Sequence, residues 1–220
     1  MTRPHVTLKL ATSLDGRIAV ASGESRWITG PEARAEVQKL RRDVNAIMIG
    51  AGTARADDPE LLARTEPPPK RQPLRVVLDT GLSLAPQGRL FASLDRAKLL
   101  IIGGAGADPA RRAALEAAGA ETALATSAAG TVDAEAALAL LAERGVGRVL
   151  VEGGGKLAAS LILAGAIDRI EWMRAPIVLG EEGRAAIGPL MVQRVSEAPA
   201  WRRVAFRALG PDLWESYERV

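Results

Sequence analysis

Apolar and polar residues alternate at the start of the chain. From Val6 to Leu10 every second residue is apolar, which is the period of a strand that packs one face on a core. Asp15-Gly16 then supplies a turn before a second short strand at Arg17–Ala21. We therefore predict that the protein begins with a β-strand and a tight turn.

Later segments repeat apolar residues at the spacing of a helix. Pro31 begins the first of them, where its missing N–H would have no helical partner anyway. Asp108 and Asp133 are suited to cap two further helices, each of which a glycine ends. A fourth helix is predicted at Lys156–Ala164.

Short apolar runs between these helices predict strands, several of them covered on both faces. The predicted strands are Ala46–Ile49, Leu74–Leu78, Lys98–Ile102, Glu121–Thr126, Arg148–Val151, Ile167–Leu179, Trp201–Leu209 and Leu213–Glu218. The proline-rich segment Glu66–Pro73 is expected to be a surface loop. The alternation predicts an α/β fold with a mixed, mostly parallel sheet flanked by helices and antiparallel strands near the C-terminus. We expect residues 1–220 to form a single domain.

The low content of cysteine and histidine limits the kinds of catalytic and metal site that the chain can form. The 220 residues include no cysteine and one histidine, His5, which excludes disulfides, cysteine-ligated metals, thiol nucleophiles and histidine clusters. We expect no metal.

Charge and hydropathy bear on partners and location. The net charge of +3 comes from interleaved residues without a polybasic run, so we expect no nucleic-acid partner. The longest apolar stretch, Leu157–Ile167, falls short of the roughly 18 residues of a membrane span, so no membrane partner is expected either. The N-terminus lacks an apolar signal region, and we expect a cytoplasmic protein.

Three predicted strands run into glycine-rich turns, after Ile49, Ile102 and Val151. A glycine turn before a helix presents backbone N–H groups that attract a phosphate, although glycine also ends buried strands without any ligand. None of the turns is a complete dinucleotide or P-loop motif. Gly153-Gly154-Gly155 is the best candidate, because three glycines suit a close approach to the backbone.

Several polar residues are candidates for a site, each with a plain structural alternative. Asp58 is suited to begin a helical turn at Asp58-Pro59, whereas Asp57 is freer to act. Glu152 follows a buried strand where open α/β sheets bind ligands. Arginines such as Arg41 can grip phosphate, and Trp27 is either core or a stacking plate for a flat ring.

Five blocks in this order resemble the reductase domain of the bacterial riboflavin-biosynthesis deaminase/reductase family. They are Leu8–Arg17, Ser22–Thr29, Leu40–Arg42, Gly52–Pro59 with Arg64, and Val149–Gly154. The resemblance implies a fold like dihydrofolate reductase, a homodimer, and NADPH-dependent reduction of 5-amino-6-(5-phosphoribosylamino)uracil, in its open-chain imine form, to the ribitylamino product.

The resemblance also implies the site residues. The expected cofactor contacts are Ala11, Trp27, Thr53, Asp57, Thr80, Gly154, Gly155, Lys156 and Leu157. The expected substrate contacts are Ser25, Arg41, Leu61, Arg64 and Glu152. Asp57 and Glu152 are the expected catalytic residues, and either Asp57 or a bound water protonates the imine nitrogen.

The chain also departs from the family pattern. It has neither the H-x-E nor the P-C-x-x-C motif of the zinc deaminase, so we expect reduction without deamination. Whether the pyrimidine carries an amino or an oxo group at position 2 stays open, and Thr80 lies where the family varies. The alternatives are a reductase of another pterin-like or imine compound and a non-catalytic nucleotide- or nucleic-acid-binding module.

Overall fold

A computed structural model describes residues 3–128 and 130–220 of the chain. The chain divides into two compact units. Unit 1 comprises Lys39–Leu150 with the N-terminal residues to His5, and unit 2 comprises Val6–Gln38 and Val151–Val220. The formation of one domain by residues 1–220 stays a prediction.

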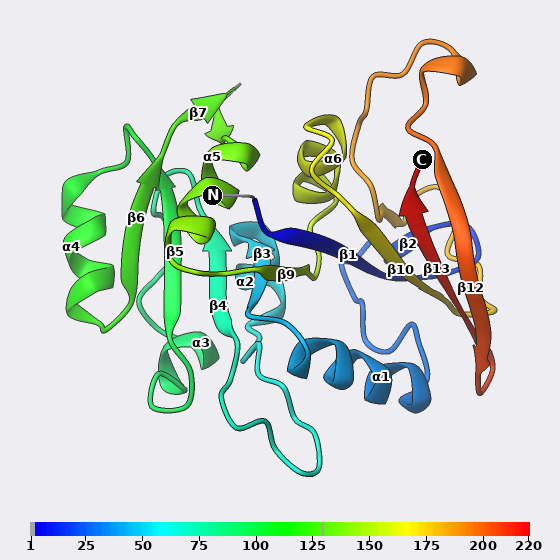
Figure 1. Ribbon diagram of the computed structural model, residues 1–220, viewed down its shortest axis with the longest axis horizontal. Coiled ribbons are helices and arrows are strands. Elements are labelled where there is room, and N and C mark those ends of the chain that lie inside the picture. The colour runs from blue at the N-terminus through cyan, green and yellow to red at the C-terminus, as the bar shows by residue number, and fades with distance from the viewer. Residues whose placement is uncertain (1–2, 129) are drawn as a thin grey trace. The chain divides into compact units, whose positions relative to one another are not determined.

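Unit 1 alternates strands and helices. Its strands lie in the order β9-β3-β4-β5-β6, and the pairs from β3 to β6 are parallel. The strands are β3 (Ala46–Gly50), β4 (Leu74–Leu78), β5 (Leu99–Gly104), β6 (Glu121–Ala125) and β9 (Arg148–Val151), with a small antiparallel pair β7 (Ser127–Ala128) and β8 (Thr131–Val132). The helices are α2 (Ala51–Asp57), α3 (Arg89–Ala92), α4 (Pro109–Ala117) and α5 (Ala134–Glu143). Figure 1 shows α4 beside β6.

Unit 2 contains the antiparallel strands. Its strand order is β12-β13-β10-β1, in which only β1 and β10 pair in parallel. The strands are β1 (His5–Thr12), β10 (Arg169–Arg174), β12 (Trp201–Leu209) and β13 (Asp212–Arg219), with β2 (Arg17–Ala19) paired to β11 (Arg184–Ala185). The helices are α1 (Pro31–Arg42), which continues into unit 1, α6 (Gly155–Leu163) and the short 3₁₀ helix η1 (Val195–Glu197).

These elements confirm the predicted α/β class, with mostly parallel strands flanked by helices and antiparallel strands at the C-terminal end. Local signals placed the helix starts correctly. The carboxylates of Asp108 and Asp133 accept the backbone N–H groups of Ala110 and Ala136, each at 2.8 Å. The loop Glu66–Pro73 contains neither helix nor strand, as predicted.

Other boundaries differ from the prediction. The strand expected at Ile167–Leu179 is confined to β10, because the chain leaves the sheet at Ala175-Pro176. The strand expected at Arg17–Ala21 ends at Ala19. Helices α2 and α3 were not expected, since they have seven and four residues and carry no full apolar repeat.

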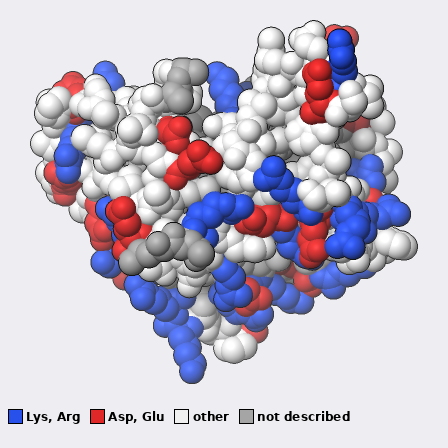
Figure 2. All heavy atoms as spheres, turned by 45° about the horizontal axis from the view of Figure 1, so that its top comes forward, with Lys and Arg blue, Asp and Glu red and all other residues white. Residues whose placement is uncertain are grey.

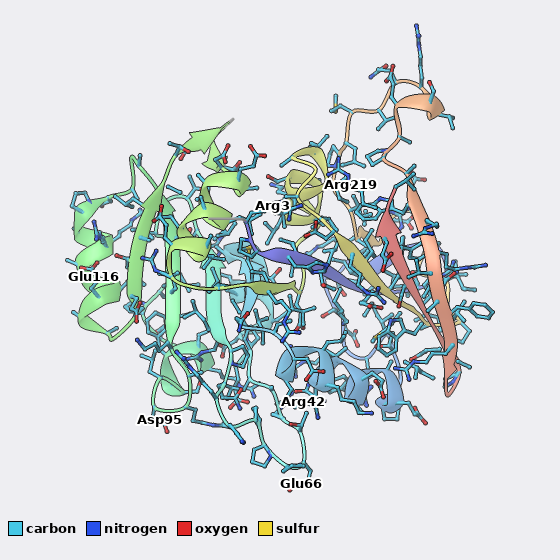
Figure 3. The ribbon with its side chains drawn as sticks, in the orientation of Figure 1. Arg3, Arg42, Glu66, Asp95, Glu116 and Arg219 are labelled. Atoms are coloured by element: carbon cyan, nitrogen blue, oxygen red, sulfur yellow. The ribbon has the colours of Figure 1, made fainter. Side chains whose placement is uncertain are left out.

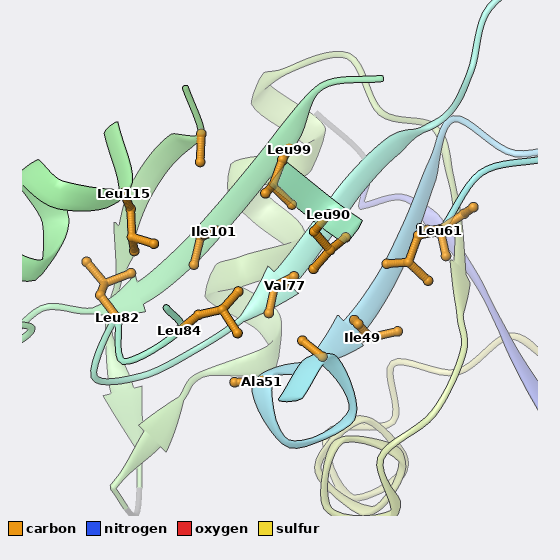
Figure 4. Packing of buried hydrophobic residues seen from close by; sticks show 13 residues of the cluster. Ile49, Ala51, Leu61, Val77, Leu82, Leu84, Leu90, Leu99, Ile101 and Leu115 are labelled. Atoms are coloured by element: carbon orange, nitrogen blue, oxygen red, sulfur yellow. The ribbon is translucent and has the colours of Figure 1, made fainter. Parts of the chain in front are cut away.

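The core of unit 1 is a ladder of residues in register. Ile49, Val77 and Ile101 stand side by side on β3, β4 and β5, and all three are fully buried. Leu61 and Leu90 pack on the same cluster from outside the sheet (Figure 4). Strand pairing and apolar burial thus hold the segment after α2 against the sheet.

Arg75 interrupts this apolar face. It lies between Ile47 and Leu99 in the sheet register, two residues before Val77, and is fully buried. Its guanidinium donates to the Ser93 hydroxyl at 2.7 Å. It also donates to backbone carbonyls, namely those of Glu60, Leu90, Ser93, Ala97 and Lys98.

Burial lowers the pKa of Arg75 to about 10, so the side chain stays charged at neutral pH. A buried charge is costly unless it is hydrogen-bonded, and here the carbonyl dipoles supply that compensation. Arg75 therefore ties the Glu60 segment and the turns around α3 to the centre of the sheet.

We expect Arg75→Met to lower the free energy of unfolding by at least about 3 kcal/mol, because several buried carbonyls lose their donor together. Urea denaturation followed by circular dichroism measures this. Arg112→Met is the matched control, since Arg112 makes an exposed ion pair with Glu116 and should cost about 1 kcal/mol or less. Equal losses in the two variants would contradict the role of Arg75.

Candidate functional site

The expected site residues fall into two groups, one in each unit, and each group is described by itself. Unit 1 carries Arg41, Thr53, Asp57, Leu61, Arg64 and Thr80. Unit 2 carries Ala11, Ser25, Trp27, Glu152, Gly154, Gly155, Lys156 and Leu157.

In unit 1, Thr53 and Asp57 lie on α2. They are four residues apart, so they share one face of the helix, and Asp57 is exposed at its last position. Asp58 follows in the left-handed conformation, with φ of 38°, and ends α2.

The interpretation of Asp58-Pro59 as the start of a helical turn is wrong. The Asp58 carboxylate instead accepts the backbone N–H of Arg89 at 2.8 Å, the first residue of α3. Asp58 therefore caps a helix 31 residues further along the chain, a distance over which no local signal acts.

The segment 60–64 brings together three expected substrate contacts. Arg41 donates from Nη1 to the Leu62 carbonyl at 3.1 Å. Leu61 has a left-handed φ of 51° and a side chain buried in the core, so only its backbone is available to a ligand. Arg64, at the end of the segment, keeps 55% of its side chain exposed.

Three arginines gather around the carboxylate of Glu60, at the start of this segment. The Glu60 carboxylate lies 3.4 Å from Arg64, 3.3 Å from Arg89 and 3.5 Å from Arg96. Three guanidinium groups thus share this one carboxylate, and guanidinium groups are well suited to bind an anion. After the segment the chain extends to Glu66 and returns to β4 (Figure 3).

Thr80 lies in a turn whose geometry is fixed by Asp79. The buried Asp79 carboxylate accepts the Leu84 N–H at 2.7 Å and the Ser83 hydroxyl at 3.0 Å. The Thr80 hydroxyl accepts the Val132 N–H at 3.0 Å and keeps its own proton to donate.

The turn at Gly103-Gly104 is closed by the protein itself. A Cβ on Gly103 would lie 2.7 Å from the Leu82 side chain, and one on Gly104 would meet Ser127 and Thr80. These glycines are explained by packing without a ligand, which favours the plain structural interpretation for this turn.

In unit 2, Trp27 is a surface residue and not part of the core. Its side chain is 70% exposed, and the Arg34 guanidinium lies 4.4 Å from the ring centroid. Arg34 also donates to the Thr29 carbonyl at 2.7 Å, which fixes it over the ring. Together with Ile177 and the buried Asp212, these residues line a hollow of about 410 Å³.

Gly153 and Gly154 have φ of 112° and 92°, values that favour glycine, and they lead into α6. At Gly155 the close approach is made by the protein itself. A Cβ there would lie 2.8 Å from the Ala185 carbonyl, and the Gly188 N–H donates to the Gly155 carbonyl at 2.8 Å. The approach that the three glycines suggested is therefore made at Gly155 by the chain's own backbone.

Three of the other expected residues of unit 2 lie next to the start of α6 in sequence, and two lie near the N-terminal strands β1 and β2. Glu152 is half-buried directly after β9, Lys156 is exposed, and Leu157 is buried. Ala11 lies on β1 opposite Met173 of β10, and Ser25 is half-buried in the loop after β2.

Asp15 fixes a second loop of unit 2. Its carboxylate accepts the Ser13 hydroxyl at 2.5 Å and the backbone N–H groups of Leu179 and Gly180 at 3.1 and 2.8 Å. The hydrogen bond from Ser13 is the main reason that the pKa of Asp15 falls to about 2. Asp15 therefore holds the segment that leads to β11 and Gly188.

The sequence did not reveal the residues that support these groups. Each of these residues contacts backbone or ring atoms of another segment in its own unit. They are Arg75, Gln72 and Asp79, which hydrogen-bond to backbone groups, and Arg34, which lies over the Trp27 ring. For Arg75 a signal existed, because an arginine inside the apolar run Leu74–Leu78 is unusual.

Two features are absent from the residues that the structure describes. Among residues 3–128 and 130–220, no group of three or more histidine, cysteine, aspartate or glutamate side chains is arranged to hold a metal ion. Over the same residues, the helices are all too short or too polar to cross a membrane. Figure 2 shows acidic and basic side chains interspersed on the face in view.

The fold and the two groups define an α/β protein with an arginine-bearing segment and a glycine turn at a helix start, features that suit phosphorylated ligands. The chain belongs to the RibD C-terminal domain family, whose model matches residues 4–214. The resemblance read from the sequence is thereby confirmed.

Relatives match along nearly all of the chain. The riboflavin biosynthesis protein RibD of Bacillus amyloliquefaciens is 34% identical over 96% of this chain and 56% of its own length. The Escherichia coli protein of the same name is 32% identical over 96% of this chain and 58% of its own length. The chain thus spans a little over half the length of these curated relatives.

Solved structures of RibD proteins and of a related reductase are similar to this chain along nearly its whole length. Acinetobacter baumannii RibD superposes with a TM-score of 0.85 and 28% identity, covering 99% of this chain and 58% of that one. A Thermotoga maritima deaminase/5-amino-6-(5-phosphoribosylamino)uracil reductase gives 0.80 and 28%, covering 99% and 57%. The Saccharomyces riboflavin biosynthesis reductase Rib7, at 0.79 and 18%, covering 99% and 90%, shares the fold.

We expect Gly155→Ala to lower the free energy of unfolding by about 1–3 kcal/mol, because the new methyl group would press on the backbone at Ala185. Urea denaturation measures the loss. Gly106→Ala is the control, since nothing lies within 4 Å of the added Cβ there. If both variants are as stable as the wild type, the contact at Gly155 is not a constraint.

Proposed function

We propose that the chain catalyses the NADPH-dependent reduction of 5-amino-6-(5-phosphoribosylamino)uracil, in its open-chain imine form, to the ribitylamino product of riboflavin biosynthesis. The observation that carries the proposal is the segment 60–64 of a RibD C-terminal domain, which bears Arg64 and whose Leu62 carbonyl accepts a hydrogen bond from Arg41. The Thermotoga maritima relative is named a reductase of this same uracil derivative, which supports the choice of substrate.

The residues of unit 2 fit a dinucleotide cofactor. The start of α6 offers backbone N–H groups after Gly154, and the exposed Lys156 adds a cation for a phosphate. Trp27 presents an exposed ring, of the kind that stacks on a flat heterocycle. We assign these residues, with Ala11, Leu157 and Thr80, to NADPH.

When bound, NADPH supplies the hydride. The protein must hold the imine carbon of the substrate toward it and deliver one proton to the imine nitrogen. Asp57, or a water that Asp57 orients, is the proposed route for that proton, because Asp57 is exposed on the same face of α2 as Thr53. We assign Glu152 and Ser25 to the polar groups of the substrate.

The substrate phosphate is assigned to Arg41 and Arg64. A guanidinium pairs two N–H donors with two phosphate oxygens, which gives direction as well as charge. Arg41 reaches the Leu62 carbonyl with Nη1, and this bond fixes the guanidinium next to the segment that carries Arg64.

We expect the wild-type protein to oxidise NADPH, followed by its absorbance, when the aminopyrimidine phosphate is added in its deaminated form. Arg64→Ala should raise KM for that substrate roughly tenfold or more, since a charge-assisted hydrogen bond is lost. Arg112→Ala, on the outside of α4, is the control and should change KM less than about twofold.

The outcomes separate the alternatives. Turnover of only the form that still carries the 2-amino group would correct the substrate. Binding of NADPH without turnover of either form would point to another imine or pterin-like substrate. A protein that binds no NADPH would overturn the proposal.

We also propose that the protein is a homodimer. Strand β12 is an edge strand of unit 2, and its seven residues from 202 to 208 are all exposed. Exposed edges of this length tend to pair with another chain, and Phe206 leaves 68% of its surface in solvent.

Sedimentation should give a dimer for the wild-type protein and a shift toward monomer for Phe206→Asp. Val195→Asp is the control, because Val195 in η1 is equally apolar and 94% exposed. A monomeric wild-type protein would rule out the homodimer.

A further inference from the structure

Gln72 makes a reciprocal clamp on the segment 60–64. The backbone N–H of Ala63 donates to the Gln72 side-chain oxygen at 2.9 Å, and the Gln72 amide nitrogen donates to the Ala63 carbonyl at 2.9 Å. Both backbone groups of one residue are thus satisfied by one side chain, as they would be by a neighbouring strand. Ala63 itself is buried.

The clamp completes a set of ties along consecutive residues. Arg75 donates to the Glu60 carbonyl at 3.3 Å, Arg41 to the Leu62 carbonyl at 3.1 Å, and Gln72 holds Ala63. The segment has no helix or strand of its own, so these side chains replace the backbone pairing that would otherwise fix it.

The residue after the clamp is Arg64. The Ala63 carbonyl belongs to the peptide bond that joins Ala63 to Arg64. The hydrogen bond from Gln72 to this carbonyl therefore helps to set the direction in which the Arg64 side chain points. An arginine fixed at its backbone loses less freedom when it binds a phosphate. The Glu60 carboxylate, 3.4 Å from Arg64, is the group with which a bound phosphate must compete.

We propose that Gln72 is a positioning residue for the phosphate of the substrate, acting through Ala63 on Arg64. The inference deepens the proposed function and rests on it for the identity of the full substrate. It predicts weaker binding of the phosphate group alone, with little effect on the rest of the substrate.

The test measures the binding of ribose 5-phosphate to the full chain by calorimetry, and KM for the phosphorylated and the dephosphorylated aminopyrimidine. In Gln72→Ala we expect ribose 5-phosphate affinity to fall roughly three- to tenfold and KM of the phosphorylated substrate to rise to the same extent. KM of the dephosphorylated compound should stay the same. A general structural defect would change both values.

Three further variants sharpen the test. Gln87→Ala removes an exposed glutamine of the same unit and should leave all values unchanged. Gln72→Glu keeps an acceptor for the Ala63 N–H but faces the Ala63 carbonyl with a negative charge, so it should weaken binding as Gln72→Ala does. In an Arg64→Ala background, Gln72→Ala should have no further effect on phosphate binding.

The outcomes distinguish the two proposals. If the wild type reduces neither aminopyrimidine but Gln72→Ala still weakens ribose 5-phosphate binding, the clamp stands and the proposed substrate falls. Unchanged ribose 5-phosphate binding in Gln72→Ala, no binding to the wild type, or additive effects of the Gln72 and Arg64 substitutions would each overturn the role of Gln72.

Discussion

The buried guanidinium of Arg75 is the interaction on which the organisation of unit 1 depends. Apolar side chains surround it in the sheet, so the charge can be tolerated only if nearly every N–H finds an acceptor. The acceptors are carbonyls that lie 15 to 23 residues away in sequence, on both sides of the strand. Satisfying one side chain therefore fixes two irregular segments at once.

The hydrogen bonds of Arg75 also affect the position of three arginines at the surface. With the Glu60 backbone held by Arg75, the Glu60 carboxylate becomes a fixed point that Arg64, Arg89 and Arg96 share. Such exposed ion pairs contribute little to stability one by one. Their effect here is geometric, because they keep three guanidinium groups close to one another.

Unit 2 depends on a different constraint, the close approach of two backbone segments at Gly155. Helix α6 begins without a side-chain cap, and the carbonyl of its first residue, Gly155, accepts a hydrogen bond from the Gly188 N–H. The segment that ends at Gly188 is also held where it begins, because the Asp15 carboxylate accepts the backbone N–H groups of Leu179 and Gly180. A glycine is needed at 155 because the neighbour is backbone, which cannot turn aside as a side chain can.

The sequence predicted what depends on neighbours along the chain. Asp108 and Asp133 were recognised as caps because their partners lie two and three residues away. Asp58, by contrast, caps a helix 31 residues away, and Gln72 reaches back nine residues to Ala63. No periodicity or motif encodes such pairs, so the sequence did not reveal the partners of Asp58 and Gln72, and for Arg75 it offered only the unusual position of an arginine inside an apolar run.

The proposed reaction depends on how its two reactants are aligned more than on reactive side chains. Hydride transfer needs no nucleophile and no metal, so a chain without cysteine and with one histidine lacks nothing that the chemistry requires. What it requires is alignment, and binding energy from a remote phosphate can provide that alignment only if its receptor is rigid. A segment without regular structure becomes rigid through long-range ties such as those of Arg75 and Gln72. The precision of such a site is therefore set by residues that touch neither ligand.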